Sequence, residues 1–596
     1  MMGVSSKVRL SLLLLPRVAV ALLGYAYIHP DEWHQSGEYL ALQYAGIPTV
    51  LPWEFEIALP CRSVASISFF NAPFIGLTYL RSHLGFGPSA RDLFLVQRGT
   101  FVVYSFLNDW MVRWLCRKHD KAYRSTVRLL LSTSHAGVVF MARPFTNSIE
   151  AVLLTAAFCC VDSLSELPDQ LYYTSSKSSL RAALWTHWAI RSFSLGACFA
   201  FGFFARFTFA IFALPCGLLY LYIAGTMRGS FRTASLVPAA LPAAAGFAIV
   251  SAAHILFDTI HFRRRELWPP VITPVNAFSY NLQAQNLARH GIHPRWLHVL
   301  VNAPMLLGVP AYGCFLFMML TPRPFARQKS ASMAPLQPLC LATIVCGLAL
   351  LSIQPHQEPR FLLALITPVT LIFATQAQNN RRWRKWLIRL HILQSIAMVA
   401  LFGFLHQAGV TPSLLQINDA VRAVQAGRPH GQRLIYARPG DTAVSVHVWS
   451  WKLFMPPAHQ VVSTRAGCMY GFGTARDGPA VTVTLYDPPG EELHELAALV
   501  DHKVQEDAQK GLRQTHLVLA PSWDDLALQA EQPGTHGANF SMQLVHSVGP
   551  HLDLDHLPQL IQRWRRAASW WPEMHVEIFR VTRTPSGLLP AEDLGS

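Results

Sequence analysis

The chain has few charged residues: Asp, Glu, Lys and Arg make up only 14% of its 596 residues, while 52% are hydrophobic. A soluble protein carries about a quarter charged residues, so this composition excludes an ordinary water-soluble enzyme. The positive mean hydropathy of +0.27 agrees with that exclusion. The shortage of charge therefore predicts a polytopic α-helical membrane protein.

Common metal-binding motifs are absent as well. The ten cysteines form no CxxC pair and the chain contains no HExxH, so the sequence predicts no metal site. Only Cys61 and Cys468 lie clearly outside the apolar runs, where an oxidising compartment would allow a disulfide between them. A free cysteine inside an apolar run is simply a small apolar residue.

Eleven apolar runs approach the length of about 20 residues that crosses a bilayer. They lie around residues 10–28, 93–116, 126–142, 146–165, 186–204, 207–224, 235–257, 296–320, 335–353, 360–377 and 387–405. No small-residue cleavage site follows the first run and charged residues do, so we expect a signal-anchor helix that is not removed.

Lys and Arg in short loops predict the orientation. If the N-terminus, with Lys7 and Arg9, is cytosolic, then the short basic loops are also cytosolic: "RKHDKAYR" (117–124), "SSKSSLR" (175–181), "MRGSFR" (227–232), "TPRPFARQK" (321–329) and "NNRRWRKW" (379–386). The odd number of spans then places the chain after about residue 406 in the lumen.

Residues 406–596 have a different composition from residues 1–405. They hold 15 Lys and Arg against 19 Asp and Glu, whereas the first region holds 34 against 15. The pI of about 9.5 thus reflects topology and gives no indication of nucleic-acid binding. A helical stretch at 491–511 and β-rich runs predict a small lumenal α/β domain; the runs are 433–438, 480–487, 515–522, 542–548 and 575–583.

The polar clusters of the membrane region all map to the predicted lumenal side. They are "HPDEWHQSGE" (29–38), "RPFTNSIE" (143–150), Arg206, "WPPVITPVNAFSYN" (268–281) and "QPHQEPRF" (354–361). A transporter would instead need ionisable groups near the midplane together with repeats or broken helices, and no convincing repeat is visible. The sequon Asn539-Phe540-Ser541 is usable only if its domain is lumenal. We therefore expect a site at the lumenal membrane face.

A carboxylate at this face can act as general base on a hydroxyl, and Arg or His can stabilise a departing phosphate. Asp31 is the first candidate for the base because Pro30 stiffens the exit from the first span, and Glu32 is the alternative. A purely structural interpretation stays open, in which Pro30, Asp31 and Glu32 only start a helix.

Structural interpretations also remain for the basic residues. Glu358 and Arg360 could form an internal pair at a helix entrance, with Pro359 in its first turn. Arg143 and Arg206 lie next to predicted spans, where an arginine can merely snorkel to the interface.

His29-Pro30-Asp31-Glu32 after the first span resembles the HPDE signature of the α-mannosyltransferases of the GT-C superfamily, the dolichol-phosphate-mannose-dependent enzymes of the endoplasmic reticulum. Further segments resemble the fourth GPI mannosyltransferases, the PIG-Z type. These are "PWEF" (52–55), "LPCRS" (59–63), "ARPFTNSIE" (142–150), "TPVNAFSYN" (273–281), "NLARHGIHPRWLHVLVNAPMLLG" (286–308), "PHQEPRFLL" (355–363) and "WKLFMPP" (451–457). The last segment departs from the family pattern, with Leu453-Phe454 in place of a Thr-Tyr pair.

The resemblance implies a reaction. Dolichol phosphate mannose would be the donor, a GPI-anchor precursor with three mannoses the acceptor, and a fourth mannose would be added in α-1,2 linkage with inversion at C1. The predicted lumenal loops hold no DxD-type dyad, as suits a lipid-phosphate donor, and no cofactor is implied. The protein would be a multi-pass glycoprotein of the endoplasmic reticulum membrane, in contact with membrane lipids and without a nucleic-acid partner.

The resemblance also assigns residues. Asp31 would be the catalytic base and Glu32 a supporting or acceptor-binding residue beside His29. The other candidates for substrate binding are Arg143, Asn147, Glu150, Arg206, His356, Gln357, Glu358 and Arg360. The phosphate ligand stays open among Arg360, Arg206 and His356.

Two other functions stay open from the sequence. One is a sister enzyme, either the third GPI mannosyltransferase or a mannosyltransferase of lipid-linked oligosaccharides; Pro359 and the "PCRS" segment argue against it. The other is a non-catalytic transporter of a lipid or a sugar.

Overall fold

The computed structural model describes residues 6–84, 87–167, 178–226, 232–264, 266–289, 291–321, 336–428, 431, 433–438, 441–461, 479–488, 493–509, 513–522, 540–566 and 574–583. Two residues singled out above, Cys468 and Asn539, lie outside these ranges. The chain folds into two compact units, each discontinuous in sequence. The first comprises Met1–Ala21, Leu51–Ala72 and Arg98–Val399, and the second comprises Leu22–Val50, Pro73–Gln97 and Ala400–Ser596.

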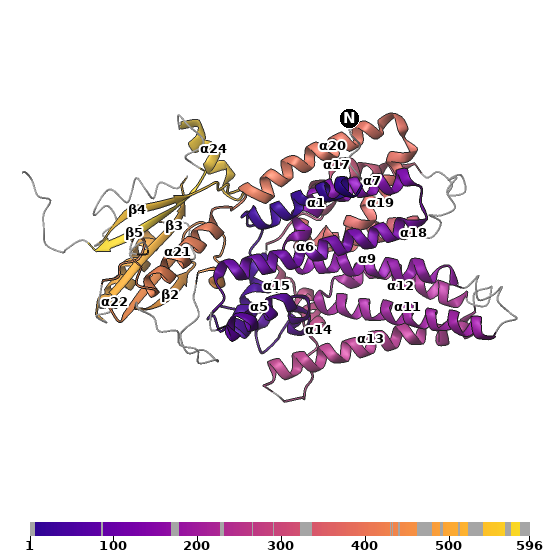
Figure 1. The fold of residues 1–596 in the computed structure, drawn as a ribbon, viewed down its shortest axis with the longest axis horizontal. Coiled ribbons are helices and arrows are strands. Elements are labelled where there is room, and N and C mark those ends of the chain that lie inside the picture. Colours follow the sequence, from indigo (N-terminus) through magenta and orange to yellow (C-terminus); the bar gives the residue numbers. More distant parts are fainter. Residues whose placement is uncertain are drawn as a thin grey trace, which may run out of the picture. The chain divides into compact units, whose positions relative to one another are not determined.

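The first unit is helical (Figure 1). Its helices include two that continue into the second unit, α1 (Ser6–Leu23) and α6 (Ala90–Leu115). Further helices in the described part of this unit include α4 (Val64–Phe70), α7 (Lys121–Thr133), α8 (His135–Val138), α9 (Thr146–Leu164), α11 (Ser178–Ala205), α12 (Phe209–Gly225), α13 (Thr233–Phe262), α14 (Thr273–Leu282), α15 (Ala284–Ala288), η4 (His298–Asn302), α16 (Ala303–Leu307), α17 (Val309–Leu320), α18 (Leu336–Ile353), η7 (Pro359–Leu365), α19 (Ile366–Asn379) and α20 (Arg381–Val399).

Six stretches of the described chain are long and apolar enough to cross a membrane. They are Thr146–Leu164, Ser179–Ala205, Thr233–Phe262, Leu336–Ile353, Pro359–Asn379 and Arg382–Leu405. Shorter apolar helices lie at Leu14–Leu23, Phe209–Gly225, His298–Leu307 and Val309–Leu320. The prediction of a membrane protein with many apolar helices is confirmed at this level, and the count of eleven spans stays a prediction.

Two predicted spans are not continuous helices. The run at 126–142 stops being helical at Ser134, whose extended backbone ends α7 before the short α8 begins. The run at 296–320 starts with the π-helix η4 and breaks at Gly308, whose φ of +93° is a conformation that glycine adopts without steric cost. Pro310 cannot donate a helical hydrogen bond, which favours the break.

Helices α9 and α13 are buried to different degrees. In the apolar stretch of α9, 83% of the residues are buried inside the protein, whereas in that of α13 only 11% are buried. Large apolar side chains of α13 are therefore left uncovered, among them Val237, Leu241 and Ile249. Such a surface suits contact with lipid rather than water.

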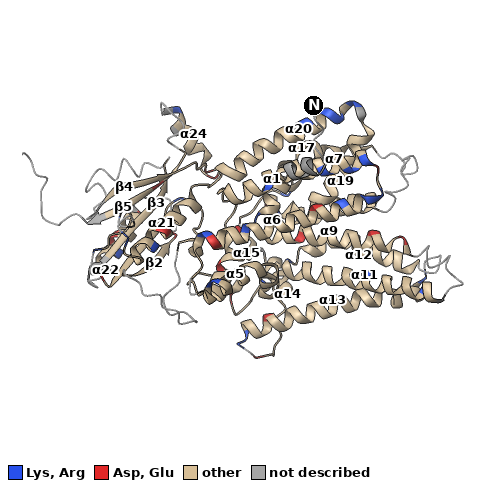
Figure 2. Ribbon diagram, in the orientation of Figure 1, with Lys and Arg blue, Asp and Glu red and all other residues tan. Residues whose placement is uncertain are grey.

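Basic residues gather at one end of this helical unit (Figure 2). Arg117, after α6, pairs with Asp162 near the end of α9 at 2.7 Å. Arg384, at the start of α20, donates to Thr126 of α7 at 3.0 Å. The polar segments around the start of α9 lie at its other end, because α9 has 19 residues and a helix of that length spans about 28 Å.

The second unit contains a mixed five-stranded sheet of order β2-β1-β3-β5-β4. β1 (Ala443–Ser450) is parallel to β2 (Ala480–Tyr486) and β3 (Arg513–Pro521), and β5 (Val576–Arg583) is antiparallel to β3 and β4 (Phe540–Val548). The helices are α2 (Asp31–His34), α3 (Gly37–Ala45), α5 (Ala72–His83), α21 (Val410–Gln425), α22 (Leu493–Gln509) and α24 (Leu557–Arg566).

The core of this unit lies between α22 and the sheet. Leu496 and Val500 of α22 are fully buried in one cluster with Trp449, Val518 and Phe579 of β1, β3 and β5. Four of the five predicted strands correspond to β2, β3, β4 and β5, and the predicted helix corresponds to α22. Residues 433–438 are not a strand, and β1 was not predicted.

Candidate functional site

Glu150 and Arg206 form a buried ion pair in the first unit. Glu150, in the first part of α9, is 0% exposed, and its Oε2 lies 3.3 Å from Nε of Arg206 between α11 and α12. The Thr208 hydroxyl donates to Glu150 Oε1 at 2.9 Å, and the Asn147 amide donates to Oε2 at 3.0 Å. Three predicted site residues, Asn147, Glu150 and Arg206, are thus in direct contact.

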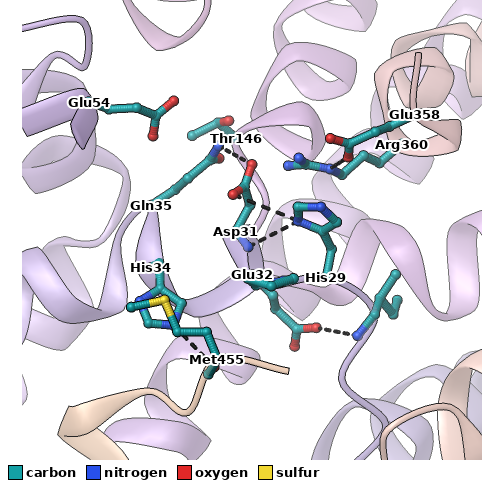
Figure 3. A network of polar contacts seen from close by, with 12 residues as sticks. His29, Asp31, Glu32, His34, Gln35, Glu54, Thr146, Glu358, Arg360 and Met455 are labelled. Carbon is teal, nitrogen blue, oxygen red and sulfur yellow. Dashed lines mark hydrogen bonds and ion pairs between the residues drawn. The ribbon is translucent and has the colours of Figure 1, made fainter. Parts of the chain in front are cut away.

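A second ion pair, which we did not predict, joins Arg62 to Glu54. Glu54 is labelled in Figure 3. Arg62 also donates to the Thr146 hydroxyl at 3.4 Å and to the Ala205 carbonyl at 3.5 Å. Arg206 donates to the same Thr146 hydroxyl at 3.2 Å. The only sequence signal for Arg62 and Glu54 is that they belong to "LPCRS" and "PWEF", two of the segments that carry the family resemblance.

The third ion pair is the one between Arg360 and Glu358, which the sequence left open. Nε of Arg360 donates to Glu358 Oε2 (Figure 3), and His356 Nε2 lies 2.7 Å from Glu358 Oε1. Pro359 opens the helix η7, as predicted for a helix entrance. The pair therefore exists, and it holds the Arg360 side chain beside Glu358 in a defined position.

The Gln357 side chain connects neighbouring segments through hydrogen bonds. Its Oε1 accepts from the backbone N–H of His298 at 2.8 Å. Its Nε2 lies within hydrogen-bonding distance of the carbonyls of Arg295, Ser352 and Gln354, at 3.3, 3.2 and 3.1 Å. Gln357 thereby joins η4 to the segment of His356 and Glu358 that leads into η7 and Arg360.

The half-buried ring of Phe361 is surrounded by cationic and donor groups. The guanidinium carbons of Arg206 and Arg360 lie 5.3 and 5.4 Å from its centroid. The rings of His356 and His298 are centred 5.7 and 6.3 Å away. We call Phe361, Arg206, Arg360, His356 and His298 the Phe361 cluster. His298 was not among the predicted site residues.

The guanidinium groups of Arg62, Arg206 and Arg360 are close enough for Arg62 and Arg360 to affect the pKa of Arg206. Burial lowers the pKa of Arg206; Glu150 opposes this shift, while Arg62 and Arg360 add to it. Arginine stays protonated despite such a shift because its ordinary pKa is above 12. Each of Arg62, Arg206 and Arg360 has its own carboxylate, so the three pairs together carry no net charge.

Arg143 is fully buried at the turn before α9, and the side chain of Arg206 is only 11% exposed. The interpretation of both as side chains that merely snorkel to the interface is therefore wrong. The sequence left this alternative open because two residues next to apolar runs can lie inside a helical unit as easily as at its rim.

Asp31 lies in the second unit, at the start of the one-turn helix α2 (Figure 3). The Gln35 amide donates to Asp31 Oδ2, and the Asp31 N–H donates to His29 Nδ1 at 3.2 Å. The carboxylate remains 28% exposed. Asp31 follows the cap position of this helix, and the cap residue, Pro30, makes no side-chain hydrogen bond.

Glu32 has different surroundings from its neighbour. It is 0% exposed, and its Oε2 accepts the backbone N–H of Ile28 at 3.3 Å. This contact holds the chain where it leaves α1. Glu32 therefore supports the segment from inside, whereas Asp31 reaches solvent.

The segment 451–460 contacts the HPDE segment within the second unit. The Met455 carbonyl accepts from the Tyr27 hydroxyl at 3.0 Å and lies 3.3 Å from His34 Nε2. The ring of Phe454, one of the two residues that depart from the family pattern, lies 5.5 Å from that of Tyr27. The departure is thus accommodated by packing against Tyr27, two residues before the signature.

Glu38 and His459 make a further buried contact between the same two segments. His459 Nδ1 lies 2.7 Å from Glu38 Oε1, and both side chains are almost fully buried. The backbone N–H of His459 donates to the same oxygen at 3.2 Å. Glu38 and the segment 451–460 were not recognised as neighbours because they are far apart in sequence.

The first unit thus brings together Asn147, Glu150 and Arg206, and separately His356, Glu358 and Arg360, with Phe361 between them. The second unit holds His29, Asp31 and Glu32. That both sets serve one site stays a prediction. No group of three or more His, Cys, Asp or Glu side chains suited to a metal ion occurs among the described residues.

Residues 8–440 match the sequence profile of the Alg9-like mannosyltransferase family. The chain belongs to this family. As the predicted family resemblance required, it is a glycosyltransferase, and its apolar helices embed it in a membrane.

Relatives of this mannosyltransferase include human GPI alpha-1,2-mannosyltransferase 4, which is 32% identical over 73% of this chain and 72% of that protein. GPI mannosyltransferase 4 of Saccharomyces cerevisiae is 29% identical over 74% of each chain. GPI mannosyltransferase 4 of Eremothecium gossypii is 28% identical over 92% of this chain and 95% of that protein. The similarity to proteins of this name thus covers most of the mannosyltransferase.

Among solved structures, ArnT from Cupriavidus metallidurans bound to undecaprenyl phosphate has a TM-score of 0.45 and 10% sequence identity, over 96% of this chain and 98% of that chain. The oligosaccharyltransferase of Archaeoglobus fulgidus, in its peptide-tethered form, has a TM-score of 0.41 and 11% identity, over 87% and 69% of the two chains. These likenesses concern the general course of the chain and say nothing about its substrates.

Proposed function

We propose that this mannosyltransferase adds the fourth mannose to a GPI-anchor precursor. Dolichol phosphate mannose is the donor, and the acceptor is the 2-hydroxyl of the third mannose. The proposal draws its acceptor from the relatives named GPI mannosyltransferase 4. Its chemistry depends on one observation: Asp31 of the family signature presents a partly exposed carboxylate that Gln35 and His29 hold in place.

The reaction is a single displacement at C1 of the donor mannose. The Asp31 carboxylate takes the proton of the acceptor hydroxyl as its oxygen attacks C1. The bond between C1 and the phosphate oxygen breaks, and dolichyl phosphate leaves with the bonding electrons. A β-linked donor thereby gives an α-linked product, and the reaction uses no cofactor.

The leaving phosphate needs cationic or hydrogen-bonding partners. Arg360 and Arg206, which both contact the Phe361 ring, supply planar guanidinium groups that can bind two phosphate oxygens at once. Their carboxylates, Glu358 and Glu150, orient the guanidinium groups before substrate arrives. We propose Arg360 as the main ligand, with His356 and Arg206 as the alternatives. Arg143, Asn147 and Glu150 support the same region.

The topology belongs to the same proposal. We infer a GT-C architecture with eleven spans in the endoplasmic reticulum membrane, with the reaction and residues 406–596 on the lumenal side. A C-terminal tag should resist protease added to intact microsomes, and a chain glycosylated at Asn539 should lose mass on deglycosylation. If protease digested the tag on intact microsomes without detergent, residues 406–596 would not be lumenal.

Lipid analysis in cells that lack the gene tests the acceptor. The expected result is accumulation of a GPI precursor with three mannoses, cleared by the wild-type chain and retained with Asp31→Asn. Accumulation of a precursor with two mannoses would indicate the third GPI mannosyltransferase instead, and truncated oligosaccharide lipids would indicate an oligosaccharide enzyme. An unchanged lipid profile would overturn the proposal.

A further inference from the structure

His298 is the member of the Phe361 cluster for which the proposed function has no use. It begins the π-helix η4, and its side chain is 0% exposed. Turns of π-helix occur frequently at functional sites. The backbone N–H of His298 already donates to Gln357 Oε1 at 2.8 Å, so only the ring remains to be explained.

The protonation of the ring follows from its neighbour Asn302. The amide nitrogen of Asn302 lies 3.1 Å from Nδ1 of His298. An amide nitrogen donates hydrogen bonds and cannot accept them. Nδ1 of His298 must therefore be the acceptor, and the neutral ring carries its proton on Nε2.

The Nε2–H group of His298 is a buried donor that meets no acceptor in the described part of the chain. Buried polar groups are nearly always hydrogen-bonded, and an exception calls for an explanation such as a ligand. Asn302 fixes the ring by its hydrogen bond to Nδ1, and Gln357 fixes the backbone of the same residue by accepting its N–H. The direction of the Nε2–H group is thus fixed by the folded chain.

The groups around His298 indicate what kind of acceptor it meets. Its ring lies 6.3 Å from that of Phe361, and the guanidinium groups of Arg206 and Arg360 lie against this same ring. Two guanidinium groups, each already paired with a carboxylate, and a neutral donor around one aromatic ring supply N–H groups that suit an anion with several oxygens. A phosphate has that chemistry, because different oxygens can accept from different donors.

We propose that His298 Nε2–H donates a hydrogen bond to a phosphate oxygen of the lipid-linked mannose donor, as a substrate-binding residue alongside the arginines. This inference deepens the proposed function and rests on it. A neutral donor adds a contact without adding charge, which matters where three ion pairs are already balanced. The GPI precursor also carries phosphate, so the test must separate the two sources.

The test uses the full-length chain in lipid nanodiscs and measures binding of dolichyl phosphate, with dolichol as the probe that lacks phosphate. His298→Phe keeps a ring and removes the donor, and we expect it to weaken dolichyl phosphate binding roughly ten- to a hundredfold. His298→Gln returns an amide N–H near the position of Nε2 and should stay within a few-fold of wild type. Dolichol binding and KM for the acceptor should not change in either variant.

His254→Phe is the matched control. His254 is also a buried histidine of the first unit, but its two nitrogens are occupied by the Val250 carbonyl and the Ser66 hydroxyl, and it lies outside the Phe361 cluster. Its removal should leave dolichyl phosphate binding unchanged.

Two results would overturn the inference while leaving the proposed function intact. One is wild-type affinity for dolichyl phosphate in His298→Phe with mannose transfer preserved. The other is a rise in KM for the acceptor alone, which would place the contact on the phosphate of the GPI precursor. If wild-type protein neither bound dolichyl phosphate nor transferred mannose, the proposed function would fail and this inference with it.

Discussion

Asp31 and Glu32 show how two adjacent carboxylates can have different tasks. Asp31 is 28% exposed and contacts the Gln35 side chain, whereas Glu32 is buried and accepts a backbone N–H from Ile28. A base that takes a proton from a substrate must reach it. The difference in exposure therefore favours the proposal that Asp31 is the base and that Glu32 supports the segment.

Asp31→Asn should lower the rate of mannose transfer at least about a hundredfold, because an amide cannot take the acceptor proton and general-base catalysis contributes about 10²–10⁴-fold. Protein abundance should not change, since an amide has nearly the same shape. Glu32→Gln should instead lower abundance more than the rate per folded molecule. Single-turnover transfer in detergent, corrected for folded protein, measures both; a near-normal rate in Asp31→Asn would move the base elsewhere.

Arg360→Lys keeps the positive charge but loses the planar fork that can bind two phosphate oxygens. We expect it to raise KM for dolichol phosphate mannose and to lower the rate, with normal abundance. Arg206→Lys is the comparison, because both guanidinium groups contact Phe361. If Arg206→Lys is the more damaging of the two, the main phosphate ligand is Arg206 and not Arg360.

At the scale of elements, α11 and α13 approach each other through glycines. A Cβ atom added at Gly246 of α13 would overlap the carbonyl oxygen of Phe193 in α11, and one added at Gly196 would overlap that of Ala243. Small residues allow such close approach of helices in membranes, where helix association depends on packing rather than on exclusion of water.

Gly246→Leu should therefore separate α11 from α13. Overpacking of this kind costs about 1–3 kcal/mol, so the melting temperature of the purified protein should fall. Gly313→Ala in α17 is the control, because a Cβ there meets no atom within 4 Å. Equal melting temperatures for Gly246→Leu and wild type, measured in the same detergent, would mean that these helices do not pack as described.

At the scale of the whole molecule, the second unit should be sensitive to acid. Burial lowers the pKa of His551 to about 4; Asp553 opposes the shift, and His406 and His575 add to it. The unfolded chain then binds the proton at higher pH than the folded one, near the ordinary histidine value of about 6.5. The free energy of unfolding should fall as the pH drops from about 6.5 towards 4.

This prediction is measured by limited proteolysis of residues 406–596 in the full-length protein between pH 7.5 and 4.5. Cleavage should increase as the pH falls, and His551→Gln should weaken that dependence, because glutamine does not titrate. A pH profile that is identical in wild type and His551→Gln would attribute acid sensitivity to other groups.

Much of the molecule followed from sequence because the deciding interactions are local or compositional. The shortage of charge and the apolar runs predicted a membrane protein, since lipid accepts only such segments. The HPDE segment and its companions predicted the mannosyltransferase family, which the match over residues 8–440 confirms. Most strands of the second unit were predicted from their alternation. Residues 433–438 also looked like a strand, yet they are not part of the sheet: the Tyr436 N–H donates to the side-chain Oγ1 of Thr515 in β3 and not to a backbone carbonyl.

Contacts between polar groups that are distant in sequence depend on how the chain folds. Glu150 and Arg206 lie 3.3 Å apart although 56 positions separate them in sequence, and β1 became a strand because β2 and β3 pair with both of its edges. His298 falls within the predicted span 296–320, and only the folded chain places Asn302 against its ring and Gln357 against its backbone N–H. The environment that each segment prefers can be inferred from the sequence alone, because hydropathy and local turns act over a few residues. Which charge is paired and which donor is left for a substrate depends on distances between segments, and those arise only when the chain is folded.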